Sequence, residues 1–165
     1  MTHRGAVTSA PCNCLALRQA TRHVTQFYDE YLARSGLRTT QFSILTKLKG
    51  LGPMTINALA RELVMDRTTL GRTMLPLERD GLIRIQDGTE DRRSKQLTLT
   101  QAGASRLKLA TRLWTEAQEA FERAFGANRA SHLRILLSDV VACPLAAGVD
   151  ARSSQRTSRN SVVQT

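Results

Sequence analysis

The feature that most constrains the fold is a change of hydrophobic period in the middle of the chain. Between Thr55 and Arg79 the apolar residues recur at helical spacing, in two short runs separated by Met65 and Asp66. Beyond Gly81 the period falls towards two over residues 82–86, and again over residues 95–99, as it does in strands. Two short helices around a tight turn form a helix-turn-helix, and the two strands add a hairpin, or wing. The pattern therefore predicts a winged helix-turn-helix.

Helical spacing also governs the sequence on both sides of this motif. A first helix is predicted from an N-cap at Asn13 to a stop at Gly36, and a second over residues 40–49. After a cap at Thr100, two further helices are predicted over residues 101–125 and 128–141. The expected fold class is mainly α with a small β-hairpin wing (α+β).

The same spacing predicts the domain organisation. Residues 37–100 form the winged helix-turn-helix DNA-binding domain, and residues 13–36 and 101–141 a helical dimerisation region. The apolar stripes of this region exceed what the winged domain can cover, so we expect a homodimer. Residues 1–12 and 142–165 lack periodicity and are expected to be a disordered N-terminus and a disordered tail.

Charge and composition narrow the function. The chain has 24 Lys and Arg against 14 Asp and Glu, a net charge of +10, which favours a polyanionic partner such as nucleic acid. No apolar run approaches the length of a membrane span, no secretory signal is evident, and three cysteines cannot all pair, so we expect a cytoplasmic protein with no membrane partner. The sequence has no catalytic motif, metal-ligand spacing or cofactor motif that would predict an enzyme.

Double-stranded DNA is the partner that the motif predicts. The second helix of a helix-turn-helix enters the major groove, where Arg binds guanine and a Thr methyl packs on thymine. Basic residues in the wing suit a narrow minor groove, and a helix N-terminus such as that at Thr55 suits a phosphate. The predicted DNA-binding residues are Thr55, Arg67, Thr68, Thr69, Arg72, Arg92, Arg93 and Lys95.

Two blocks, LARELVMDRTTLGRTMLPLERDGLI (59–83) and EDRRSKQLTLTQAG (90–103), resemble the MarR family of winged-helix transcriptional regulators. The second block has the wing signature of that family: an Asp, an Arg two residues later, a strand ending in Leu-Thr, and a Gly three positions further on. The resemblance covers residues 13 to 141. It implies a homodimer that binds palindromic DNA, usually as a repressor, and it favours Arg93 over Arg92 as the minor-groove residue.

The resemblance also implies how DNA could be released. Cys14 lies in the first turn of the first predicted helix, where the helix dipole favours a thiolate. In the peroxide-sensing branch of the family, the reactive Cys lies near the start of the first helix and accepts hydrogen bonds from two tyrosines. Spacing places Tyr28 on one of them, and Thr39 stands where the other tyrosine would be. The resemblance also implies that the last helix returns towards the first helix of the partner subunit, which makes Cys143 a candidate resolving thiol. The alternative is that Cys12 and Cys14 are small buried residues at a dimer seam.

A second release route is a small aromatic ligand. A MarR-like dimer has a cleft beside each winged lobe, and a mainly apolar cleft with one basic side chain suits an aromatic acid or phenol. The residues expected to line it are Arg18, Arg22, Tyr28, Tyr31, Phe42, Leu45, Leu107 and Trp114.

The sequence therefore predicts a DNA-binding transcriptional regulator, a repressor, that is released by thiol oxidation or by an aromatic ligand. The alternative is a constitutive or architectural DNA-binding protein with no sensing function.

Overall fold

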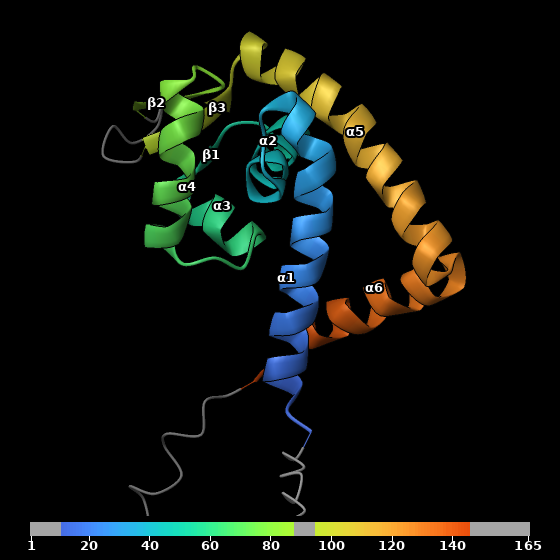
Figure 1. The fold of residues 1–165 in the computed structure, drawn as a ribbon. Helices are drawn as coiled ribbons and strands as arrows, with labels where there is room; N and C mark the ends of the chain where they lie inside the picture. The colour runs from blue at the N-terminus through green and yellow to red at the C-terminus, as the bar shows by residue number, and fades with distance from the viewer. Residues whose placement is uncertain (1–10, 88–94, 146–165) are drawn as a thin grey trace, which may run out of the picture. The chain divides into compact units, whose positions relative to one another are not determined.

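The computed structural model describes residues 11–87 and 95–145 (Figure 1). Helices dominate these residues, and three short strands form a single sheet, which confirms the mainly α fold class. In chain order the elements are α1 (Asn13–Leu32), a 3₁₀ turn η1 (Ala33–Ser35), α2 (Thr39–Leu51), β1 (Met54–Thr55), α3 (Ile56–Glu62), α4 (Arg67–Arg79), β2 (Ile83–Asp87), β3 (Lys95–Leu99), α5 (Gln101–Phe125) and α6 (Ala127–Ala142).

The first helix begins one residue earlier than predicted, at Asn13. Cys12, not Asn13, is the N-cap, and its Sγ accepts a weak hydrogen bond from the backbone N–H of Leu15 at 3.5 Å. Asn13 is the more usual capping residue, but here it has become the first helical residue. At the other end Gly36 adopts φ = 73° after the 3₁₀ turn, which confirms it as the stop signal.

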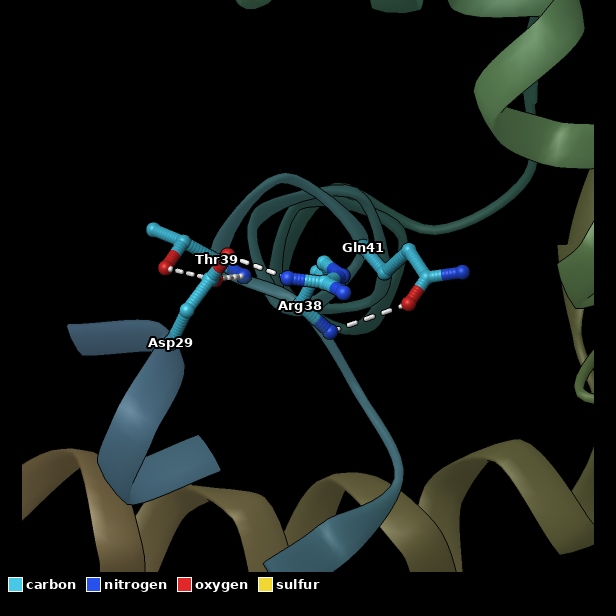
Figure 2. A network of polar contacts seen from close by, with 4 residues as sticks. All are labelled: Asp29, Arg38, Thr39 and Gln41. Atoms are coloured by element: carbon cyan, nitrogen blue, oxygen red, sulfur yellow. Dashed lines mark hydrogen bonds and ion pairs between the residues drawn. The ribbon is translucent and has the colours of Figure 1, made fainter. Parts of the chain in front are cut away.

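One carboxylate joins α1 to the start of α2 (Figure 2). Asp29 Oδ1 accepts hydrogen bonds of 2.7 Å from both the backbone N–H and the hydroxyl of Thr39, and Oδ2 pairs with Arg38 at 3.2 Å. Gln41 Oε1 in turn accepts the backbone N–H of Arg38 at 2.9 Å. Partial burial raises the pKa of Asp29, but the hydrogen bonds from Thr39 and Arg38 outweigh it, so the pKa lies below its usual value.

The helix-turn-helix is built as predicted, with one boundary corrected. Thr55 caps α3 by accepting the backbone N–H of Ala58 at 3.2 Å, and Asp66 caps α4 by accepting that of Thr69 at 2.8 Å. The predicted end of the first of these helices at Val64 is wrong, because α3 ends at Glu62. Val64 has left the helix and adopts φ = 51°, a strained value for a β-branched residue.

The sheet has a strand that the sequence analysis did not predict. Besides the expected antiparallel hairpin of β2 and β3, the two-residue strand β1 pairs with β3, so the strand order is β1-β3-β2. Met54 lies opposite Leu97, and Thr55 opposite Gln96. The extra strand places the start of α3 directly on the sheet that carries the wing.

The core of the winged region lies between α2, α3, α4 and the sheet, and α1 and α5 also contribute to it. The sheet contributes Leu97, which is fully buried, and α5 contributes Leu107, Ala110 and Leu113. The largest fully buried side chains are Leu32, Ile44, Leu45, Leu59, Leu70, Leu77 and Leu97. Aliphatic residues dominate this list, as the small number of aromatic residues requires.

The first turn of α5 is in backbone contact with the two residues that precede β2, Gly81 and Leu82. Thr100 caps the helix, accepting the N–H of Gly103 at 3.0 Å and donating its hydroxyl to the carbonyl of Gly81 at 2.7 Å. A Cβ atom placed on Gly103 would lie 2.0 Å from the carbonyl oxygen of Leu82. Only glycine therefore allows this approach.

The chain divides into two compact units, Met1–Phe121 and Glu122–Thr165, with the division inside α5. Within the second unit Arg134 pairs with Glu122 at 3.1 Å, and the Arg129 guanidinium lies 4.3 Å from the centre of the Phe125 ring. Among the described residues no helix is both long and apolar enough to cross a membrane.

Candidate nucleic-acid interface

The two faces of α4 differ sharply in character. Leu70, Met74 and Leu77 are buried in the core. At 100° per residue, the opposite side of the helix carries Thr68, Arg72, Leu75 and Arg79, and all four are exposed. The predicted residues Arg67 and Thr69 are also exposed, in the first turn. The structure therefore presents all four residues predicted on this helix at the surface, over its first two turns.

The start of α4 is fixed by its cap. The hydrogen bonds that Asp66 accepts, first from the Thr69 side chain and then from the backbone, lower the pKa of its carboxyl. The backbone N–H of Met65 bonds the carbonyl of Ala60 at 2.9 Å, which closes the turn between the helices. The exposed residues of α4 thus stand on a short, internally bonded turn and not on a free loop.

The cations of this region differ in whether they are paired. Arg79 pairs with Asp80 at 3.0 Å and Lys95 with Asp87 at 2.5 Å. Within residues 11–87 and 95–145, neither Arg67 nor Arg72 has an acidic partner. The guanidinium groups at the start of α4 are therefore available to an external anion, whereas Lys95 helps to hold β2 and β3 together.

One further predicted residue, Thr55, belongs to the sheet, as the second residue of β1. Thr55 is half-buried, and its hydroxyl is used in capping α3. Arg92 and Arg93 lie in the connection between β2 and β3, outside the described residues. Asp87 and Lys95 are paired at the loop end of the hairpin, so this connection starts and finishes at neighbouring points.

Arg61 is an exposed cation that the sequence analysis did not assign. It lies on α3 and has no ion-pair partner among the described residues. No spacing rule separates this arginine from ordinary surface charges, so only its position on α3, which packs against α4, draws attention to it.

Several residues predicted to line a ligand cleft are buried between helices. Leu45 and Leu107 belong to the hydrophobic core, at 0% and 7% exposure. Phe42 is buried and stacks on Trp114 with ring centres 6.0 Å apart. These side chains pack in the space between helices.

The remaining predicted cleft residues lie along α1. Tyr28 is buried and donates its hydroxyl to Gln118 at 2.6 Å, and Tyr31 packs on Phe27. Arg18 and Arg22 are exposed. An open hollow of about 580 Å³ contains Arg22 alone of the predicted set; it is lined by Thr21, Arg22, Thr25, Gln26, Asp29, Glu30, Ala33 and Arg38.

The cysteines are exposed, as a sensing thiol requires. Cys14 is in the first turn of α1, and Cys143 directly follows α6. Tyr28 is fourteen residues after Cys14 on the same helix, about 21 Å along its axis, so the two do not meet within one chain. Thr39 is the residue at the position of the second tyrosine, and its hydroxyl donates a hydrogen bond to Asp29.

Comparison with known proteins shows which proteins this chain is similar to. The family model described as MarR family matches residues 37–95. Among curated proteins, the HTH-type transcriptional regulator SarZ of Staphylococcus haemolyticus is 29% identical over 90 residues, which are 54% of this chain and 61% of that protein. The aligned part of the chain spans about three-fifths of the length of the curated relatives it matches.

Solved structures extend the match over most of the chain. The M. tuberculosis transcriptional regulator MosR, solved in complex with DNA, is 34% identical with a TM-score of 0.69, over 82% of this chain and 100% of that one. A mutant MarR from E. coli, solved with operator DNA, shares the fold at 20% identity and a TM-score of 0.70, over 78% of this chain and 92% of that one. With the winged helix-turn-helix, its capped recognition helix and these matches together, the chain belongs to the MarR family.

Proposed function

We propose that this chain is a sequence-specific DNA-binding transcriptional regulator, a repressor that acts as a homodimer on a pseudo-palindromic operator. The observation that carries the proposal is the exposed side of α4, where Thr68 and Arg72 lie opposite the buried face and Arg72 has no acidic partner among the described residues. A helix of this kind reads base edges in the major groove, and a free Arg can bind guanine O6 and N7 together.

Two further observations support DNA as the partner. The net charge of +10 favours binding to a phosphate backbone. The MosR and MarR structures similar to this chain were solved with DNA and with operator DNA, respectively. The wing residues Arg92 and Arg93 are proposed to contact the minor groove, and Thr55 and Lys95 the phosphates at its edges.

The dimer is proposed because α6 has apolar side chains that the described residues of its own unit leave exposed. Ile135 and Leu136 on α6 are 56% and 63% exposed, and Val141 is 66% exposed. A second copy is the partner that closed two-fold symmetry supplies. Two recognition helices related in this way sit about 34 Å apart, one turn of duplex.

The test begins with selection of duplexes from a random-sequence pool by the full chain. We expect two related half-sites one helical turn apart. Arg72→Ala should weaken binding to the enriched duplex by about 1–3 kcal/mol and relax base preference at one position of each half-site. Arg112→Ala removes an equally exposed cation from α5 and is the matched control. Equal losses in the two variants, with unchanged circular dichroism, would contradict the assignment of α4 to the groove.

Release of the DNA is proposed to occur by thiol oxidation or by an aromatic ligand. Exposure of Cys14 in the first turn of α1 supports the thiol route, and the hollow beside Arg22 supports a ligand with a carboxylate. Oxidation of Cys14 and capture by Cys143 of a second copy would change the dimer and so its fit to DNA.

One assay separates the two routes. Dissociation of the enriched duplex is measured with an organic peroxide and with a panel of aromatic acids, in the wild type and in Cys14→Ser. Loss of the peroxide response in Cys14→Ser supports the thiol, and release by an acid in both proteins supports the ligand. No release from wild-type protein under either treatment would reject both routes and leave a constitutive DNA-binding protein as the better description.

A further inference from the structure

Neither the packing nor the backbone conformation of α4 requires a glycine at position 71. It lies five residues into a 13-residue helix, where glycine is less favourable than alanine because it loses more backbone entropy on folding. Its neighbours on the helix surface are the exposed residues Arg67, Thr68 and Leu75, and the buried residue Met74. Gly71 itself is half-buried, so it leaves a gap on the flank of the helix, where the exposed side meets the side that faces the core.

Nothing in the described part of the chain fills that gap. A Cβ atom built on Gly71 has no atom of another element within 4 Å, whereas the one built on Gly103 would collide with the Leu82 carbonyl. Gly71 is also not among the residues with positive φ, so its backbone conformation is open to any L-residue. Pro76 does not account for it either, because the proline ring crowds the carbonyl four residues before it, that of Arg72.

We infer that Gly71 is the point where the backbone of α4 approaches a base-pair edge of the bound duplex. A helix with a side chain at this position stands further from the floor of the groove. Without one, the short Thr68 side chain and the backbone around Gly71 can come within contact distance of the bases. The inference rests on the proposed DNA-binding function and adds to it a residue that determines specificity by having no side chain.

The experiment uses the full chain and two duplexes of equal length, one enriched by the wild type from a random pool and one unrelated. Gly71→Ala should raise the melting temperature by about 1–4 °C, since alanine is the better helix former. It should weaken binding to the enriched duplex by about ten-fold, the size of one lost base contact. Gly71→Leu should weaken it further, because the loss follows side-chain size.

Binding of these variants to the unrelated duplex at low salt should be unchanged, because no charge has been removed. Gly50→Ala is the matched control: Gly50 is exposed in α2, a Cβ there also meets no atom within 4 Å, and α2 carries no proposed DNA contact. It should leave binding to both duplexes at the wild-type level.

The outcomes separate this inference from the function on which it rests. Wild-type affinity of Gly71→Ala for the enriched duplex would overturn the close approach and leave the DNA-binding function intact. Equal losses on both duplexes, with a lowered melting temperature, would also overturn it, because the effect would then be one of folding. Failure of the wild type to enrich any sequence would instead reject the proposed function, and the role of Gly71 with it.

Discussion

At the scale of single residues, Asp29 shows how one side chain fixes the junction of two helices. Its carboxylate bonds the first backbone N–H of α2 and a hydroxyl beside it, and an anion there also interacts favourably with the helix dipole. Asp29→Asn should lower the free energy of unfolding at neutral pH by about 1–3 kcal/mol, because hydrogen bonds to a charged acceptor are lost. Urea titration of both proteins measures the difference.

The pH dependence of that difference follows from the pKa of Asp29, which lies below its usual value of 3.8. A carboxyl with a lowered pKa stabilises the folded chain above its unfolded pKa, and this contribution is lost as the pH falls through the folded pKa. The difference in free energy of unfolding between wild type and Asp29→Asn should therefore disappear below about pH 4. Glu30→Gln, at an exposed neighbour, is the control, and a gap that persisted in acid would show that charge is not the cause.

At the scale of elements, the wing has an ion pair between its two strands and two arginines in the sequence that connects them. The Asp87–Lys95 ion pair joins the two strands at the loop end of the hairpin, and Arg93 belongs to the sequence between these two residues. Arg93→Ala should weaken binding to all duplexes and reduce the slope of log affinity against log salt by about 1, because one phosphate-neutralising charge is lost. Arg84→Ala, an exposed cation of β2, should leave the slope unchanged. Equal slopes of log affinity against log salt in Arg93→Ala and wild type would contradict a contact between the wing and DNA.

Most elements could be predicted because their signals are local. The period of apolar residues and the caps at Thr55, Asp66 and Thr100 depend on neighbours within a few positions, and the structure has all three caps. Strand β1 could not be predicted, because two residues carry no period and become a strand only by pairing with β3.

The candidate site likewise has some features that the sequence predicts and others that it does not. Exposure of Arg72 and Thr68 follows from helix geometry once the buried face of α4 is known. By contrast, the pairing of Lys95 with Asp87 depends on strand register, and the burial of Leu45 depends on which helices pack on α2. Features of this kind arise from contacts between distant segments, which the spacing of one segment does not contain.

At the scale of the whole molecule, the proposed DNA recognition depends on the proposed assembly of two chains. Light scattering should give a mass of twice 18.3 kDa at micromolar concentration. Leu136→Asp combined with Val141→Asp should shift the mass to that of one chain with little change in helix content, since both side chains are already exposed in the single chain. Ser131→Asp, at an exposed polar position of the same helix, should remain dimeric. A wild-type mass of 18.3 kDa would contradict the dimer.

The backbone contact between Gly103 and Leu82 has a mechanical consequence. Because a carbonyl and a Cα approach there without side chains between them, and Thr100 bonds the same turn, the first turn of α5 and the residues just before β2 have no side-chain layer between them that could absorb a displacement. We therefore expect a rotation of that turn to displace the start of β2 with it.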